Sequence, residues 1–221
     1  MNPDVKICKL LWLSVMAMFF QQGFAGLATF EKNSDGFQLT DSIGNTLEFD
    51  DYPSRVVTLD SGIVEIFFAL GAEDSLVGRT RFAEFPEGVA KIPDIGGIID
   101  PNFERLAEID TDLVLVGRMS ANAELLARFA QLDLPVAVLD LGTFEELVEH
   151  TELIGQLLGK AKTAEALLAN WSQQLNRLDG QARRIITQLE EPPTVLLLYG
   201  LDGHYSAGSD TWPDNILQRA G

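Results

Sequence analysis

Asp60, Arg81 and Arg118 each come shortly after the end of a short apolar run of the kind found in buried strands. In open α/β sheets, ligands bind beyond the carboxyl ends of the strands. A guanidinium group can donate two parallel hydrogen bonds to a carboxylate, and it can stack on a flat ring. We therefore expect Asp60, Arg81 and Arg118 to contact a ligand; the alternative for each arginine is an ordinary surface ion pair.

Motifs for catalysis are absent from the sequence. The dinucleotide-binding fingerprint G-x-G-x-x-G does not occur, residues 155–160 (GQLLGK) are too few for a phosphate-binding loop, and no G-x-S-x-G is present. His150 has no partner histidine in its predicted helix, and His204 is expected to be an ordinary loop residue. We expect no catalytic residue, no cofactor and no protein-held metal. A Rossmann-like enzyme is the remote alternative, and a pure adaptor protein is the third class.

The charge balance argues against one class of partner. The chain has 221 residues, with 33 acidic against 16 basic side chains, and its formal net charge is −17. Nucleic-acid binding needs clustered Lys and Arg, so we expect no nucleic-acid partner.

Residues 1–25 have the order of segments found in a secretory signal peptide. Lys6 and Lys9 precede the apolar run 10–20, and Gly23 and Ala25 supply small residues before a cleavage site. An uncleaved anchor is the alternative, but the run is short against the ~20 residues that a bilayer needs. We therefore expect cleavage after Ala25 and a periplasmic protein.

The remaining sequence predicts a mixed α/β fold. Residues 36–49 alternate in polarity on both sides of a Gly-Asn turn, which predicts a hairpin. Four later runs are uniformly apolar, as in strands buried on both faces of a parallel sheet. These runs are 56–59, 75–78, 113–116 and 136–139.

Capping residues predict where three of the intervening helices begin. Ser61 is expected to cap the first, and Asp100 a short helix with Pro101 at its first position. Thr143 and Glu146 have the spacing of a capping box.

Residues 160–190 carry apolar side chains at spacings of three and four, which predicts one long helix. The alternative is two helices joined at Gly180, since glycine weakens a helix interior. Residues 194–200 predict a new buried strand, and 211–221 the start of another helix. So few residues cannot form a second α/β lobe, so we expect a sequence that is cut short.

Several stretches together resemble the substrate-binding proteins of ABC importers for iron-siderophores, haem and vitamin B12. Besides the long helix, they are RVVTLDSGIVEIFFALGAEDSLVGRTRFAEFP (55–86), IPDIGGIIDPNFERLAEIDTDLVLVG (92–117) and YSAGSDTWPDNILQRAG (205–221). The resemblance implies two α/β lobes joined by one rigid helix, with the ligand held between them.

On this template the chain divides into four parts. They are a signal peptide (1–25), a Rossmann-like N-terminal lobe with a leading hairpin and a parallel sheet (26–158), an interlobe helix (159–191) and the start of an incomplete second lobe (192–221).

The resemblance also implies roles for single residues. Glu104 matches the position at which the family pairs with arginine on the membrane permease; the alternative is an ordinary solvated glutamate. Phe82 is expected as an apolar wall of the ligand site, with Tyr205 and Trp212 contributed by the second lobe. In a haem carrier, Tyr205 would bind the iron.

The partners that the resemblance implies are a small-molecule metal chelate and an inner-membrane ABC permease. A ferric siderophore is our first choice of chelate, and a corrinoid or haem is the alternative. We expect a monomer.

Overall fold

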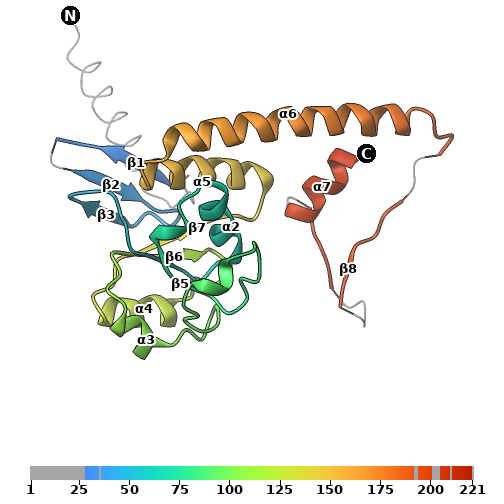
Figure 1. Ribbon diagram of the computed structural model, residues 1–221. Coiled ribbons are helices and arrows are strands. Elements are labelled where there is room, and N and C mark those ends of the chain that lie inside the picture. Colours follow the sequence, from blue (N-terminus) through green and yellow to red (C-terminus); the bar gives the residue numbers. More distant parts are fainter. Residues whose placement is uncertain (1–27, 35, 192–193, 201–204, 210, 221) are drawn as a thin grey trace, which may run out of the picture.

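The computed structural model describes most of the chain (Figure 1). The described residues are 28–34, 36–191, 194–200, 205–209 and 211–220. The predicted signal peptide and His204 lie outside them. Within the described residues, no helix combines the length and the apolar character that crossing a bilayer requires.

An antiparallel sheet leads the fold. It consists of β1 (Thr29–Lys32), β2 (Phe37–Thr40) and β3 (Thr46–Phe49) in that order. Phe37 pairs with Phe49 and Leu39 with Leu47, as the hairpin prediction requires. Strand β1 was not predicted, because its residues have no apolar alternation that continues along the strand.

The hairpin turn is fastened to the main lobe through Asp41. Its Oδ1 accepts hydrogen bonds from the backbone amides of Ile43 (3.0 Å) and Asn45 (2.7 Å), which closes the turn. Its Oδ2 accepts one from the amide of Val138 at 3.0 Å. One carboxylate therefore shapes the turn and ties it to the edge of the second sheet.

A four-stranded parallel sheet forms the centre of the lobe. Its strands are β4 (Val56–Thr58), β5 (Leu76–Arg79), β6 (Leu113–Gly117) and β7 (Val136–Leu139), in the order β5-β4-β6-β7. All four predicted apolar runs are confirmed as strands. Every residue of β6 is buried, because helices cover both faces of the sheet.

One face of this sheet packs on α2 (Ser61–Ala69) and α5 (Phe144–Leu157), and the other on α3 (Phe103–Glu108) and α4 (Ala123–Gln131). Figure 1 shows the two pairs of helices on opposite sides of the strands. The short helices η1 (Glu73–Ser75) and η2 (Val89–Lys91) complete the connections. The predicted α/β architecture is confirmed.

Two of the three cap predictions are wrong. Asp60, rather than Ser61, caps α2, because its carboxylate accepts from the first free amides of the helix. Asn102, rather than Asp100, caps α3 for the same reason, accepting from the amide of Arg105. The capping box of α5, between Thr143 and Glu146, is confirmed.

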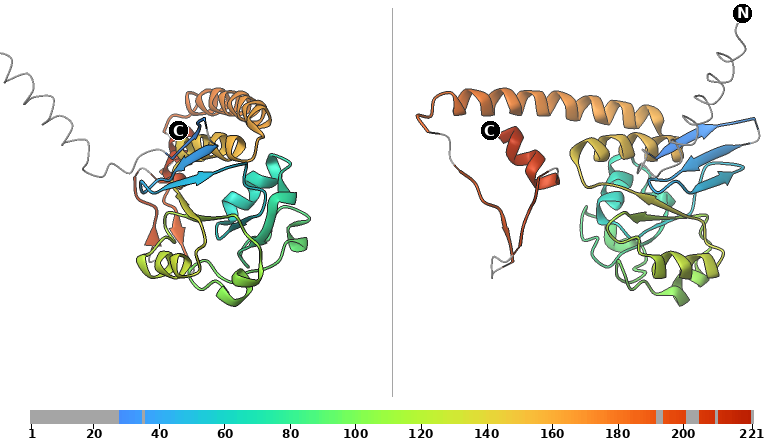
Figure 2. Two further views of the ribbon diagram at one scale, coloured as in Figure 1. Left: turned by 90° about the vertical axis from the view of Figure 1, so that its left-hand side faces the viewer. Right: turned by 180° about the vertical axis from the view of Figure 1, so that it is seen from behind.

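Helix α6 (Ala161–Ile186) is continuous over 26 residues and runs through Gly180, so the two-helix alternative is wrong. At 1.5 Å per residue it is about 39 Å long. Its beginning packs on α5, where Ala164 is fully buried, and its second half extends past the lobe (Figure 2). The helix is shorter than predicted at its carboxyl end.

The predicted buried strand over residues 194–200 is wrong in extent and in burial. Only β8 (Leu198–Tyr199) is a strand, paired with β9 (Tyr205–Ser206), and Leu196 before it is 70% exposed. Within the described residues no larger sheet lies against this segment, so its apolar side chains stay uncovered. The helix predicted after it is confirmed as α7 (Trp212–Ala220), which returns to pack on α6.

Candidate ligand-binding cleft

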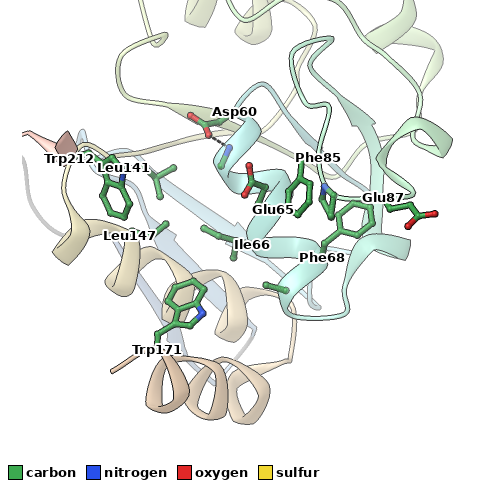
Figure 3. A pocket seen from close by; sticks show the side chains of 13 residues that line it. Asp60, Glu65, Ile66, Phe68, Phe85, Glu87, Leu141, Leu147, Trp171 and Trp212 are labelled. Atoms are coloured by element: carbon green, nitrogen blue, oxygen red, sulfur yellow. Dashed lines mark hydrogen bonds between the residues drawn. The ribbon is translucent and has the colours of Figure 1, made fainter. Parts of the chain in front are cut away.

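A cleft of about 1010 Å³ lies between the lobe, α6 and α7 (Figure 3). Helix α2 and the loop after β5 form one side of it. The start of α5, with single tryptophans from α6 and α7, forms the other. The lining residues are Asp60, Gly62, Glu65, Ile66, Phe68, Ala69, Phe85, Pro86, Glu87, Leu141, Leu147, Trp171 and Trp212.

Asp60 stands at the carboxyl end of β4, where the chain turns into α2. Its Oδ1 accepts hydrogen bonds from the amides of Gly62 (2.8 Å) and Ile63 (3.2 Å). Its Oδ2 faces β6, since a Cβ placed on Gly117 would lie 2.3 Å from it. Burial raises the pKa of this carboxyl, and the two amide hydrogen bonds partly offset the rise. The geometry holds one carboxylate rigidly at the sheet end of the cleft.

Aromatic side chains from four separate elements form the apolar walls. Trp171 comes from α6, Trp212 from α7, Phe68 from α2 and Phe85 from the loop after β5. Of these four aromatic residues, only Trp212 was expected at the ligand site from the sequence. Trp171 lies within the apolar pattern of residues 160–190 that predicted the long helix, and nothing in the local pattern marks Phe68 or Phe85 as cleft residues.

Trp212 is held in place by α5. Its ring stacks on Phe144 with centroids 5.7 Å apart and an interplanar angle of 26°. The amide of Phe144 donates a hydrogen bond to Oδ1 of Asn215 at 3.2 Å. This amide is at the free amino-terminal end of α5, so Asn215 on α7 satisfies a donor that the helix itself cannot.

A second contact fastens the far end of α7 to α6. The Arg219 guanidinium donates to Asp179 Oδ2 at 3.1 Å, and it lies 4.9 Å from the centroid of the Phe144 ring. Together with the Trp212 stack, these contacts fix α7 as a wall of the cleft.

Of the predicted ligand residues, the structure brings only Asp60 and Trp212 together at the cleft. Arg81 forms an ion pair with Asp100 at 3.1 Å. Its guanidinium lies 6.0 Å from the ring of Phe82, whose side chain is 57% exposed.

Arg118 and Tyr205 are also exposed, and neither lines the cleft. Ligand contacts by Arg81, Phe82, Arg118 and Tyr205 stay predictions. The described residues contain no group of three or more His, Cys, Asp or Glu side chains placed to hold a metal ion.

Glu104 is exposed on α3, on the face of the sheet opposite α2 and α5. The helix beneath it is well anchored. Leu106 is fully buried, the Phe103 ring packs 5.4 Å from that of Phe129, and the Arg128 guanidinium lies 5.5 Å over Phe103. The Glu104 carboxylate is thus presented from a fixed backbone.

Comparison with known proteins gives a consistent match. Residues 56–221 match the family described as periplasmic binding protein. The uncharacterised ABC transporter substrate-binding lipoprotein YvrC of Bacillus subtilis is 29% identical over 169 residues, which are 75% of this chain and 53% of that protein. The vitamin B12-binding protein of Pectobacterium atrosepticum is 20% identical over 169 residues, or 76% of this chain and 61% of that one.

A solved structure shares the fold. The periplasmic heme binding protein from Pseudomonas aeruginosa matches with a TM-score of 0.68 and 26% identity, covering 76% of this chain and 61% of that one. The chain thus spans between 53% and 61% of the length of the two curated relatives.

Proposed function

Because this chain belongs to the periplasmic binding protein family, we propose that it is the solute-binding component of an ABC importer. The observation that carries the proposal is the cleft of about 1010 Å³ walled by Phe68, Phe85, Trp171 and Trp212. Small-molecule sites are typically concave, largely apolar and of roughly 300–1,000 Å³, with a few polar groups that orient the ligand. Asp60 is such a polar group.

The ligand that we propose is a ferric siderophore, captured as a complete chelate between the first lobe and the elements beyond α6. Cobalamin or haem is the second candidate, and it is supported by the similarity of this chain to a vitamin B12-binding protein and to a periplasmic heme binding protein. A haem carrier would need an iron ligand, and Tyr205, which is 75% exposed on β9, is the candidate for it.

Delivery requires recognition by a permease, and we assign this role to Glu104. Its exposure on the anchored helix α3 supports the assignment, since an arginine on a partner could reach the carboxylate without any rearrangement of the lobe. The proposal includes export by the leader, residues 1–25, so that the protein works in the periplasm.

A ligand panel tests the proposal directly. The full chain is titrated with ferric siderophores, cobalamin and haem while tryptophan emission and melting temperature are recorded, with iron-free siderophores as controls. We expect saturable quenching by a ferric siderophore and a rise in melting temperature, because ligand that binds only the folded state stabilises it. In a matched Trp171→Phe/Trp212→Phe double variant, the ligand should still raise the melting temperature, but most of the quenching of tryptophan emission should be lost.

The possible results distinguish the proposed class of protein, a solute-binding component, from the proposed ligand. Binding of cobalamin or haem alone would replace the siderophore and keep the role in solute capture. A panel in which no compound changes either signal would contradict solute capture itself.

A further inference from the structure

The charged side chains that line the cleft are all acidic. Asp60, Glu65 and Glu87 carry carboxyl groups, and none of the residues that line the cleft is a lysine or an arginine. Glu65 and Glu87 are exposed and have no ion-pair partner among the described residues. Their charges therefore act on whatever occupies the space between them.

The arginines that could balance this charge are engaged or lie elsewhere. Arg81 is paired with Asp100 at 3.1 Å and is not among the residues that line the cleft. Arg219, near the end of α7, is paired with Asp179 of α6, and neither residue lines the cleft. Arg118 is exposed but does not reach the lining.

The opposite side of the cleft also favours a cationic over an anionic ligand. Figure 3 shows Trp171 and Trp212 across the pocket from Glu65 and Glu87. The face of an indole ring carries a partial negative charge, so it attracts cations and disfavours anions. The formal net charge of −17 adds a long-range field that concentrates cations near the protein.

We infer that this cleft selects uncharged or cationic metal chelates over anionic ones. The inference rests on the proposed capture of a chelate in this cleft and specifies its charge class. Tris-catecholate complexes and other polyanionic chelates are then poor ligands, and hydroxamate complexes without net negative charge are good ones. A ligand held by Arg81 and Arg118 would instead be expected to carry anionic groups that pair with the guanidinium groups.

A series of ligands with one metal centre isolates the charge. Ferrioxamine B has a free cationic amine, its N-acetyl derivative is neutral, and its N-succinyl derivative is anionic, while all three share the same ferric hydroxamate core. We expect the cation to bind the full chain about tenfold more tightly than the anion at low ionic strength, with the neutral complex between them. The difference should shrink at high salt, because exposed carboxylates are screened.

Matched variants show whether the lining carboxylates cause the difference. Glu65→Gln together with Glu87→Gln should reduce the cation preference several-fold. The control is Glu31→Gln with Glu48→Gln, which changes the net charge equally on the leading sheet, away from the cleft. Equal effects of the two pairs, or tighter binding of the anion by the unmodified chain, would overturn the inference.

A measurement without any chelate separates the inference from the proposed function. In a Trp12→Phe background the emission comes from Trp171 and Trp212, both of which line the cleft. We measure how strongly caesium and iodide ions quench this emission, each normalised to quenching by uncharged acrylamide. The ratio of caesium to iodide quenching should fall in the Glu65→Gln/Glu87→Gln variant, which has lost two carboxylates that attract cations, and change less in the control variant. If no ferrioxamine binds, siderophore capture fails, and an unchanged quenching ratio in the cleft pair would reject the charge selectivity as well.

Discussion

Gly155 of α5 and Ala164 of α6 lie so close that a Cβ at residue 155 would be only 2.4 Å from the Cβ of Ala164. Both residues are buried, and the contact fixes where the long helix leaves the lobe. Two backbones can approach this closely only where one of them has no side chain.

The first prediction follows from this contact. Gly155→Ala should lower the free energy of unfolding by about 1–3 kcal/mol, because the added methyl group overpacks the helix interface. Adding Ala164→Gly should restore most of the loss, since the exchange moves the methyl group to the other helix and leaves the summed helix propensity nearly unchanged. Urea unfolding followed by circular dichroism measures both variants. A double variant as unstable as Gly155→Ala would contradict the overpacking account.

The second prediction concerns the attachment of α7. A double-mutant cycle of Arg219→Ala and Asp179→Ala should give a coupling free energy of unfolding of about 0.5–1 kcal/mol. The ion pair is partly shielded from water, and Arg219 also lies over the Phe144 ring. Trp212 emission, in a Trp12→Phe and Trp171→Phe background, reports whether α7 is docked.

The comparison pair is Glu124 and Arg128 on α4, which have the same 3.1 Å separation but are more exposed. Its coupling should be smaller, about 0.3 kcal/mol. Additive effects of the Arg219 and Asp179 changes would mean that the ion pair does not hold α7.

The third prediction concerns the dependence of stability on pH at His150. Burial lowers the pKa of this side chain, whose Nε2 lies 3.3 Å from Ser42 Oγ beneath the hairpin turn. As pH falls below 6.5, the unfolded chain takes up a proton that the folded protein binds only at lower pH. Stability is therefore lost as pH falls from 6.5 through the lowered folded-state pKa.

His150→Gln removes this titration. Urea unfolding over a pH series that crosses 6.5 should show that the wild type loses more stability on acidification than the variant does. A difference between the two proteins that stays constant with pH would exclude the role of His150.

The fourth prediction concerns Asp60, where stability depends on pH in the opposite direction from His150. Because burial raises the pKa of its carboxyl, the folded protein binds this proton more readily than the unfolded chain. This proton uptake stabilises the folded protein below pH 3.8, and the stabilisation is lost as pH rises through the pKa of Asp60 in the folded state. Asp60→Asn, which keeps an acceptor for the α2 amides, should therefore gain stability relative to the wild type as pH rises through this window.

Asp60→Ala serves as the contrast to Asp60→Asn. It should cost about 1 kcal/mol at neutral pH, since the cap itself is lost. If the asparagine and alanine variants were equally unstable in urea, the capping role of residue 60 would be wrong.

Much of the lobe could be predicted because its elements are encoded locally. The apolar runs that became β4, β5, β6 and β7 are recognisable without knowing their neighbours, since strands buried on both faces need apolar side chains at every position. The capping box of Thr143 and Glu146 is equally local. The caps of α2 and α3 were misplaced because several residues in each loop could accept the free amides, and only the path of the backbone selects one.

The sequence by itself determined the α/β pattern, the helical character of residues 161–186 and the acidic character of the chain, because each depends on residue types at short spacing; that α6 continues through Gly180 was decided by the structure. Only the tertiary structure decided which side chains share the cleft. Asp60 and Glu65 belong to the cap and body of α2, while Trp171 and Trp212 come from segments far along the chain, and their meeting depends on helix packing at Gly155 and on the attachment of α7 at Phe144. Such contacts arise from complementary surfaces of folded elements, and short-range spacing carries no information about them.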